Sequence, residues 1–434
     1  MAYPKMPDFM RLTEAIRYYA QMKHEYGAKG IAPILRNAEQ ALKATVKEMQ
    51  RLPVDRQLAE KEPSGLTDIR SLRPRGPRRM LDTIDDAQYA ERLQGALLGR
   101  FAGCILGAIV EGWEIEAMAS LAKQNGDDFP PKDYWSATPM PYVKRYDVSP
   151  RESFTRSKLD GVPVDDDLIY TQLGLLILED YGPQFTLEDV GKAWLKYLPH
   201  AAGAEELALR NLRKGIPASK AAEIDNYWWY NIGGAIRSDP WGYVAPGWPE
   251  KAAELAWRDA SISHRRQGIH AEMFFSATIA AALVMDNPIE ALKIGLTEIP
   301  KDCSFARAVK WALKMAPQIR NYRQARAAVD KRFAGMDKVH SINNACLDIW
   351  GLSIGGRDFT RVIGETVAMG LDSDCTTATA GSIAGAIVGK KGIPEHWYRR
   401  FNNKAYSYIT NHRLFHIDDL LKRFAKQARL IAKS

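Results

Sequence analysis

The sequence contains few cysteines and no long hydrophobic run. Its four cysteines, Cys104, Cys303, Cys346 and Cys375, form no CxxC pair and no spacing typical of a disulfide framework. Such usage is typical of a reducing compartment, and the charged start MAYPKMPDFMRLTEAIRYYAQMK is not the pattern of a signal peptide. The longest apolar runs, FAGCILGAIV and ATIAAALVM, are shorter than the roughly 18 to 20 residues that cross a membrane. We therefore predict a cytoplasmic protein without a membrane span.

Several common catalytic signatures are also missing. The sequence has no phosphate-binding P-loop and no GxGxxG dinucleotide fingerprint, and its GxSxG string, GLSIG at 351–355, lies in a helical pattern and not in a strand-to-helix elbow. Its eight histidines are scattered and give no HExxH spacing. These absences argue against a serine hydrolase of the α/β type, a P-loop nucleotidase, a nicotinamide-dependent enzyme and an HExxH zinc protease.

The positive charge is concentrated in the first part of the chain. Residues 1–80 contain sixteen Lys and Arg against nine Asp and Glu, a net charge of +7 out of +8 for all 434 residues. Such an arm can contact nucleic acid or an acidic partner, although a solvated helical extension has the same composition and is the more common reading. The rest of the chain is nearly neutral, so the basic isoelectric point belongs to this N-terminal arm.

Helical patterns run through most of the sequence, and strand-like alternation is scarce. Amphipathic periodicity predicts helices near residues 8–26 and 33–51, and helical segments continue from about residue 86 to the end. Between them, KEPSGLTDIRSLRPRGPRRM is rich in Pro, Arg and Gly, and we interpret it as an extended, exposed linker. We predict an all-α protein, with an N-terminal helical extension and linker at 1–85 and one large bundle-like domain at 86–434.

Two predicted helices contain glycines at every fourth position. The glycines of GALLGRFAGCILG are residues 95, 99, 103 and 107, and those of GSIAGAIVG are 381, 385 and 389. Each glycine within a helix costs roughly 1 kcal/mol relative to alanine, so seven in register need a packing reason. Residues four apart share one helix face, where another backbone can approach closely. The spacing predicts two tightly packed central helices that are candidates to pack against each other.

Two acidic clusters precede apolar helical segments. Asp165, Asp166 and Asp167 stand before LIYTQLGLLILEDYG, and Asp372 and Asp374 stand at the start of DSDCTTATAGSIAG. N-capping explains one Asp in front of a helix, and it remains the alternative for either cluster taken alone. Neighbouring carboxylates repel one another unless a cation lies among them. Because oxygen-only ligand sets suit Mg²⁺ or Mn²⁺ better than zinc, the residues favour a metal-assisted hydrolase.

Four segments resemble the motifs of a known family and occur along the chain in the order of those motifs. GRFAGCILGAIVEGW is similar to a Gly-rich helix that ends in a carboxylate, here Glu111. DDDLIYT stands where that family has Thr-Asp-Asp-Thr, and GLDSDCTTATAGSIAG resembles its Asp-x-Asp-Thr motif. The segment between them has the family's Ser-His and Gly-Ile pairs in SHRRQGIHAEM. Residues 86–400 thus resemble the ADP-ribosylglycohydrolases, whose bacterial type is the dinitrogenase-reductase-activating glycohydrolase.

The resemblance implies a fold and a metal centre. It implies a single large orthogonal helical bundle that holds two Mg²⁺ ions, or Mn²⁺, at the base of a cleft. Carried over by position, the metal ligands are Asp165, Asp166, Asp167, Asp372, Asp374 and Thr376. Three positions depart from the family's threonines, since they are Asp165, Leu168 and Cys375 here. Either an added carboxylate compensates for a lost hydroxyl, or the substrate differs from the usual one.

The resemblance also implies a reaction and the residues that perform it. The family breaks the bond between C1″ of a ribose and an acceptor nitrogen or oxygen, which requires an activated water and help for the leaving group. The predicted catalytic carboxylates are Asp166, Glu111 and Asp374, although Glu111 alone is also explained as a surface residue. Predicted substrate contacts are His264, Gly268, Ile269, His340 and Asn344. Lone histidines are more often structural, and a simple turn explains Gly268 as well as a phosphate contact does.

The sequence leaves three functions open. The lead hypothesis is release of ADP-ribose from an ADP-ribosylated protein or a small ribosyl conjugate. A first alternative is hydrolysis of a nucleoside-like N- or O-ribosyl metabolite, which the altered Thr positions and the aromatic segment NYWWYNIGGAIRSDPWGYVAPGW permit. A second alternative is a non-catalytic module that binds ADP-ribose and docks through the basic arm. The presence of carboxylates at all five Asp positions favours an enzyme.

Overall fold

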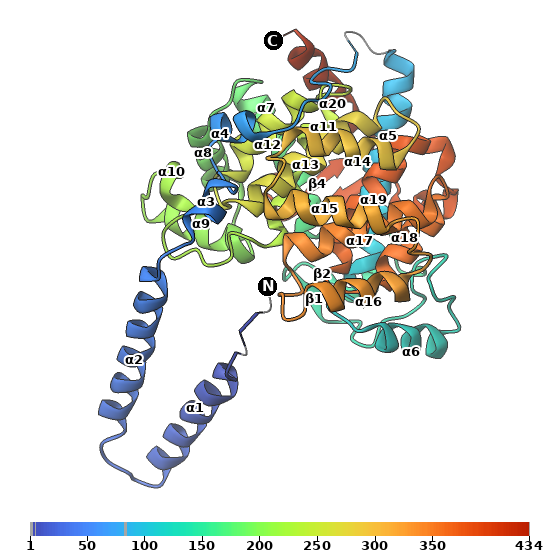
Figure 1. The fold of residues 1–434 in the computed structure, drawn as a ribbon. Coiled ribbons are helices and arrows are strands. Elements are labelled where there is room, and N and C mark those ends of the chain that lie inside the picture. The colour runs from blue at the N-terminus through green and yellow to red at the C-terminus, as the bar shows by residue number, and fades with distance from the viewer. Residues whose placement is uncertain (1–2, 5, 82–84, 434) are drawn as a thin grey trace. The chain divides into compact units, whose positions relative to one another are not determined.

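The structure is a computed structural model that describes residues 3–4, 6–81 and 85–433. These residues divide into two compact units, Met1–Glu60 and Lys61–Ser434. The smaller unit contains α1 (Phe9–Glu25), α2 (Ile31–Arg51) and α3 (Arg56–Glu60), which confirms the two helices that amphipathic periodicity predicts (Figure 1). Neither α1 nor α2 contains a buried residue, so packing does not fix their sequences.

The larger unit is almost entirely helical, which confirms the predicted all-α class. Its helices are α4 (Leu66–Leu72), α5 (Asp86–Ala108), α6 (Ile115–Asn125), α7 (Asp166–Tyr181), α8 (Leu187–Tyr197), α9 (Gly203–Arg213), α10 (Ala218–Ala221), α11 (Asp239–Tyr243), α12 (Pro249–Ala260), α13 (Gln267–Ala282), α14 (Pro288–Gly295), α15 (Ser304–Met315), α16 (Tyr322–Arg332), α17 (Ser341–Gly355), α18 (Phe359–Ala368), α19 (Ser373–Val388) and α20 (Ile417–Ala432). Two antiparallel hairpins join β1 (Lys144–Arg145) to β2 (Ser149–Pro150) and β3 (Lys404–Tyr406) to β4 (Leu414–His416). Among the described residues, no helix has both the length and the apolar character that a membrane span requires.

The two glycine-rich helices pack directly against each other, as the spacing predicts. A methyl group added to Gly103 would lie 2.0 Å from the carbonyl oxygen of Thr377, and one added to Gly99 would lie 2.2 Å from that of Gly381. The pairs run in opposite directions along the chain, so α5 and α19 are antiparallel (Figure 1). Glycine is needed here because only its absent side chain lets the two backbones come this close. The end of α5 therefore lies beside the start of α19.

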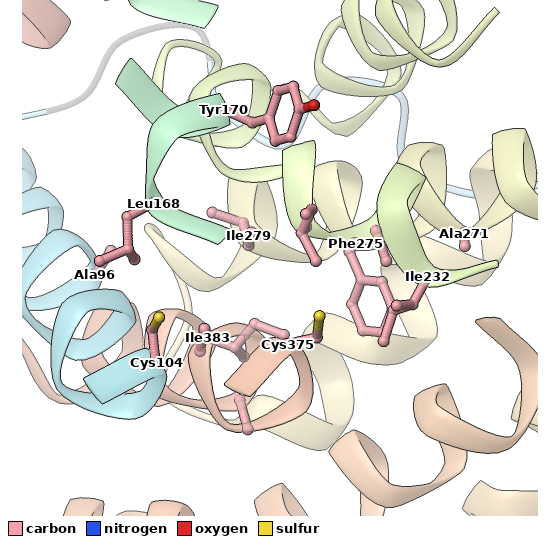
Figure 2. Close-up of a cluster of buried hydrophobic side chains, with 14 of the residues drawn as sticks. Ala96, Cys104, Leu168, Tyr170, Ile232, Ala271, Phe275, Ile279, Cys375 and Ile383 are labelled. Carbon is pink, nitrogen blue, oxygen red and sulfur yellow. The ribbon is translucent and has the colours of Figure 1, made fainter. Parts of the chain in front are cut away.

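Two further helices, α7 and α13, meet this pair in the core. Figure 2 shows Cys104 of α5, Leu168 of α7, Ile279 of α13 and Ile383 of α19 converging on one apolar cluster. Helix α13 is buried on all sides, from Gly268 to Ala282, which is why its sequence is apolar around its whole circumference. This packing fixes the starts of α7 and α19 relative to each other.

The segment that we predict to be an exposed linker is instead part of the larger unit. Helix α4 forms within it and buries Ile69. Arg73 and Arg78 each donate to the buried carboxylate of Glu298, at 2.6 Å. The prediction of an extended, exposed linker is therefore wrong for this segment, because its arginines find acidic partners far along the chain. The larger unit begins at Lys61, ahead of the boundary predicted near residue 85.

Candidate active site

The acidic residues singled out in the sequence lie at the starts of two helices and the end of a third. Asp165 caps α7 by accepting a hydrogen bond from the Asp167 amide, and Asp372 precedes the first residue of α19. Glu111 follows α5, and the next residue, Gly112, donates to the Leu371 carbonyl at 2.8 Å. The antiparallel α5–α19 pair thus brings these chain segments together.

We call the resulting group of six carboxylates the acidic centre: Glu111, Asp165, Asp166, Asp167, Asp372 and Asp374. Three groups of side chains that include its members have ligand atoms within 4.8 Å of one another: Glu111, Asp372 and Asp374; Asp167 and Asp374 with the thiol of Cys375; and Asp165 and Asp167 with the thiol of Cys104. Asp374 belongs to two of these groups. The structure therefore brings the two acidic clusters, some two hundred residues apart in sequence, into one place.

Arg145, at the end of β1, lies in the middle of the acidic centre. Its guanidinium donates to Asp165 at 2.8 Å, to Glu111 at 2.8 Å and to Asp374 at 2.6 Å. It also donates to the carbonyl of Ala108, the last residue of α5, at 3.0 Å. The side chain is almost completely buried. Asp165, which stands where the related family has threonine, is thus paired with a guanidinium.

A second buried arginine orients Asp167. Arg100 of α5 donates to the Asp167 carbonyl at 2.7 Å and to its carboxylate at 3.2 Å. Its other guanidinium nitrogen lies 2.8 Å from Asp239. Because both groups are fully buried, Arg100 fixes the first turn of α7 against α5.

Asp166 is the partly exposed member of the α7 cluster. Its Oδ1 accepts a hydrogen bond from the Tyr146 hydroxyl and another from the Asp167 amide at 3.0 Å. Burial raises the pKa of Asp166 to about 6, although the hydrogen bond from Tyr146 lowers it. Glu111, with 41% of its side chain exposed, has a raised pKa chiefly because of the negative charge on Asp374.

The chemistry of the centre fits a divalent cation. Asp374 Oδ1 is buried and accepts no hydrogen bond from any residue that the structure describes. Burial raises the pKa of Asp372 and of Asp167 well above the ordinary value for aspartate. Six carboxylates thus face two guanidinium groups, and an oxygen-rich site with an unsatisfied carboxylate is suited to Mg²⁺ or Mn²⁺.

The two residues after Asp374 point in different directions. The Cys375 thiol donates to Asp167 Oδ2 at 3.3 Å, so it faces the centre. The hydroxyl of Thr376 donates to the Asp372 carbonyl one turn earlier, at 2.9 Å. Thr376 is therefore engaged with its own helix in this structure, and its predicted role as a metal ligand stays a prediction.

Among the predicted substrate contacts, Asn344 contacts the acidic centre, and His340 lies one helical turn before it in the chain. Asn344 accepts a hydrogen bond from the Asp372 amide at 3.3 Å and donates to the Lys338 carbonyl at 2.7 Å. His340 caps α17 and stacks on Tyr230 with ring centroids 4.9 Å apart. Asn344 thus positions the loop that carries Asp372, and a direct contact of either residue with substrate stays a prediction.

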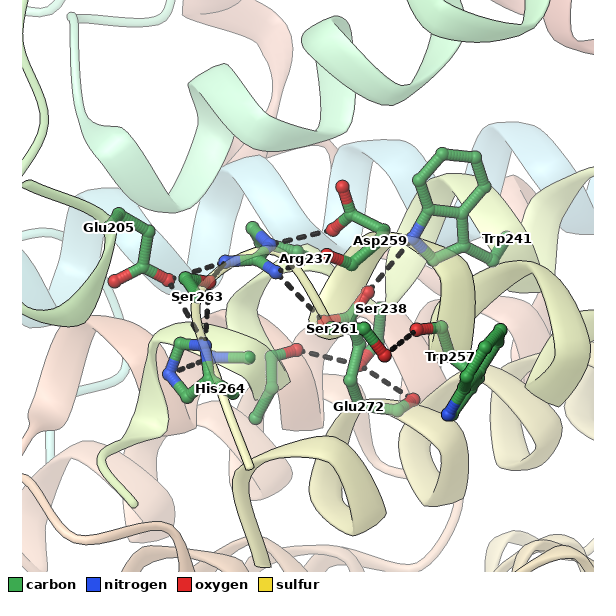
Figure 3. Close-up of polar contacts among 12 residues, drawn as sticks. Glu205, Arg237, Ser238, Trp241, Trp257, Asp259, Ser261, Ser263, His264 and Glu272 are labelled. Atoms are coloured by element: carbon green, nitrogen blue, oxygen red, sulfur yellow. Dashed lines mark hydrogen bonds and ion pairs between the residues drawn. The ribbon is translucent and has the colours of Figure 1, made fainter. Parts of the chain in front are cut away.

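The other predicted substrate contacts, His264, Gly268 and Ile269, are buried at the start of α13 and in the turn before it. His264 contacts Ser263 Oγ at 2.8 Å and accepts from the Gly234 amide at 3.2 Å, within the network of Figure 3. Gly268 is packed so closely that a methyl group there would lie 2.5 Å from the His264 ring. These contacts give the residues a packing role, and their contact with substrate is untested.

Sequence reasoning did not find Arg145, Arg100 or Tyr146. Repulsion among three consecutive aspartates indicates that a cation lies among them, but it does not say which one. Arg145 belongs to a short hairpin with a sequence, YVKRYDVSP, that has no distinctive spacing. Tyr146, the next residue, has a φ of 50°, a conformation that cannot be predicted from its residue type.

Comparison with known proteins agrees with the fold and the motifs. The ADP-ribosylglycohydrolase family model matches residues 85–429, so this chain belongs to that family. A solved structure, an ADP-ribosylglycohydrolase-related protein complex, is 20% identical with a TM-score of 0.54, over 80% of this chain and 99% of that chain. At this identity the likeness shows the fold alone. Comparison with curated proteins gives no match.

Proposed function

We propose that this protein is a metal-dependent hydrolase that releases ADP-ribose from an ADP-ribosylated substrate. Family membership supports glycohydrolase activity. The observation that carries the metal dependence is the buried, unsatisfied Oδ1 of Asp374, a residue that belongs to two of the ligand groups of the acidic centre. The carboxylates around Asp374 would accommodate two Mg²⁺ or Mn²⁺ ions, as the motifs predict.

In this proposal the chain's own carboxylates move the protons. A cation held in the centre would supply Lewis acidity toward water and the ribose hydroxyls. Asp166 is held by Tyr146 and is partly exposed, so it is positioned to accept a proton from the attacking water. Glu111 is exposed and has a raised pKa, which suits a group that donates a proton to the leaving acceptor. Arg145 holds Glu111 and Asp374 in place.

A polar cleft beside the centre supports a phosphate-bearing substrate. The cleft has a volume of about 290 Å³, and its walls include Gly112 and Leu371, each next to a member of the acidic centre. Lys338 adds a positive charge to the same cleft, whereas Arg326 there is paired at 2.9 Å with both Glu114 and Asp330, which also line the cleft. Because an ammonium group binds phosphate oxygens, Lys338 would contact the diphosphate of ADP-ribose when the ribose lies at the centre.

The direct test is turnover of defined substrates. The protein is incubated with ADP-ribosyl-arginine, ADP-ribosyl-serine and ribonucleosides in Mg²⁺, Mn²⁺ or EDTA, and released ADP-ribose or ribose is measured. We expect ADP-ribose release that requires the cation and is lost in Asp374→Asn. Asp86→Asn, which changes an exposed carboxylate of α5, is the matched control.

Each other outcome changes the assignment. Turnover of ribonucleosides alone would replace the ADP-ribosyl substrate with a nucleoside-like one. Binding of ADP-ribose without turnover of any substrate would support a binding module. Turnover that persists in EDTA and in Asp374→Asn would contradict the metal-dependent mechanism.

A further inference from the structure

A second group of metal-ligand side chains lies apart from the acidic centre. Glu62, His270 of α13 and Cys303 at the start of α15 have ligand atoms within 4.8 Å of one another. All three side chains are buried. Glu62 belongs to the segment before α4, which the sequence alone suggests to be an exposed linker. We call this group the Cys303 cluster, and neither the family motifs nor the proposed reaction uses it.

His270 is held in the form that can bind a metal. Its Nε2 lies 2.8 Å from the Pro63 carbonyl, and a carbonyl can only accept, so Nε2 carries the proton. Burial lowers the pKa of His270 to about 4, so the ring is neutral near pH 7. Its Nδ1 lone pair is buried and has no hydrogen-bond partner among the described residues. A backbone carbonyl that orients a histidine in this way is the usual support of a metal-binding imidazole.

Glu62 contributes a second buried atom without a partner. Its Oε1 accepts from the Ser304 amide at 2.5 Å, which fixes the carboxylate. Its Oε2 has no hydrogen-bond partner among the described residues and lies 3.8 Å from His270 Nδ1. That distance is too long for a hydrogen bond. Two buried acceptors that face each other without a proton between them are unfavourable unless a cation lies between them.

Cys303 supplies the third ligand. Its Sγ lies at the N-terminus of α15 and accepts from the Ala306 amide at 3.3 Å. A helix N-terminus stabilises a thiolate, although burial raises the pKa of the free thiol to about 12. When a cation binds, the Sγ–H bond breaks, the proton leaves to solvent and the sulfur lone pair forms the new bond.

We propose that Glu62, His270 and Cys303 bind a Zn²⁺ ion that joins the segment before α4 to α13 and α15. One nitrogen, one sulfur and one oxygen form a ligand set that suits zinc and not magnesium. A water molecule completes the tetrahedral coordination. Because the three side chains are buried, the ion has a structural role, and its binding free energy stabilises the docked segment.

Metal analysis of the full-length protein tests the site. The chain is loaded with Zn²⁺, freed of excess ion by gel filtration, and analysed for zinc by mass spectrometry. A Co²⁺-loaded sample is examined for the near-ultraviolet charge-transfer band of a thiolate ligand. We expect about one tightly bound zinc per chain and a thiolate band, and we expect Cys303→Ser to lose both.

Matched variants separate this site from the acidic centre. Cys346→Ser changes another buried thiol, and Cys375→Ser changes the thiol that faces the acidic centre, so both should keep the band. Glu62→Gln preserves the shape of the side chain and is expected to weaken zinc binding at least tenfold. A wild-type protein with no bound zinc and no thiolate band would overturn the proposal, and so would a band that survives Cys303→Ser.

A protease readout tests the structural role independently. Residues 61–80 contain five arginines, a residue type after which trypsin cleaves, and we expect cleavage there to be slow while the segment is docked. We expect chelation, or Glu62→Gln, to speed cleavage in this segment several-fold and added Zn²⁺ to restore protection to the chelated wild type. Cleavage rates that do not respond to zinc would contradict a structural ion.

Discussion

The larger unit contains two buried charge clusters in which one arginine contacts three carboxylates. They differ in whether every buried polar atom has a partner. In the cluster of Figure 3, Arg237 contacts Glu205 at 2.7 Å, Asp259 at 2.7 Å and Glu272 at 3.3 Å. In the acidic centre, Arg145 likewise contacts three carboxylates. No polar atom of the four Arg237-cluster side chains is both buried and without a partner, whereas Asp374 Oδ1 of the acidic centre is.

The difference separates a structural network from a site that needs a ligand. Around Arg237 one guanidinium contacts all three carboxylates, and burial raises the pKa of Glu272 well above its ordinary value. The acidic centre has six carboxylates, and 41% of the Glu111 side chain is exposed to solvent. An arginine that contacts three carboxylates is common to the two clusters, whereas an unsatisfied buried atom and exposure to solvent distinguish the acidic centre.

The largest expected effect is on catalysis, and we expect it when a residue of the acidic centre is changed. Asp166→Asn is expected to lower kcat by about 10²- to 10⁴-fold, because it removes a proton acceptor and leaves the packing intact. Glu205→Gln changes a carboxylate of the Arg237 cluster and should leave kcat within a few-fold. Steady-state rates with thermal melting of both variants check this, and a larger kcat loss in Glu205→Gln would reverse the assignment of the two clusters.

The next largest effect is on stability, and we expect it when a residue of the Arg237 cluster is changed. Arg237→Met leaves three buried carboxylates without their cation, so we expect the free energy of unfolding to fall by about 3–5 kcal/mol. Added Mg²⁺ should not restore it, since the cluster is sealed. Denaturant unfolding with and without Mg²⁺ measures this. Full recovery in Mg²⁺ would show that the Arg237 cluster is open to ions.

The helix pair that supports the acidic centre could be predicted from sequence because its signal is periodic. Glycines four residues apart require a close neighbour, and the same argument applies to both helices of the pair. The meeting of the clusters that contain Asp167 and Asp374 could be predicted for a similar reason, since each cluster has more carboxylates than helix capping needs. Both predictions rest on features that a short stretch of chain contains in full.

Arg145 and the segment 61–80 could not be predicted because their roles depend on distant partners. A lone arginine in a hairpin has no local mark that assigns it to carboxylates from three other segments. The composition of residues 61–80 resembles that of a linker, and only the folded chain places Glu298 next to Arg73 and Arg78. His264 shows the same limit, because its neighbours in sequence do not show that it is buried.

A smaller effect on stability should distinguish the two arginines. Arg145→Gln is expected to lower the free energy of unfolding by about 1–3 kcal/mol in EDTA, because three carboxylates lose charge-assisted hydrogen bonds. Here Mn²⁺ should restore stability, and its affinity should rise, since the open centre can replace a guanidinium with an ion. Denaturant unfolding and Mn²⁺ titration check this, with Arg156→Gln, a partly exposed arginine, as the control. A loss of stability that Mn²⁺ does not restore would mean that an ion cannot replace the guanidinium of Arg145, as we expect for Arg237.

The smallest effect is the pH dependence of the cation-free protein, and its sign follows from the raised pKa values of the centre. Burial raises the pKa of Asp166 from its ordinary value of 3.8 to about 6, so the folded state binds the proton more tightly than the unfolded state. The stability that this group contributes is therefore present below about pH 4 and is lost as pH rises through about 6.

A divalent cation competes with those protons, so its stabilising effect should grow over the same range. We expect Mn²⁺ to raise the Tm by roughly 1–4 °C more at pH 7.5 than at pH 5, with little difference in Asp374→Asn. Melting curves at both pH values with and without Mn²⁺ measure this. A cation effect that is equal at both pH values would mean that the carboxylates of the acidic centre are already ionised at pH 5, and the centre would then resemble the Arg237 cluster in having its charges compensated by the protein itself.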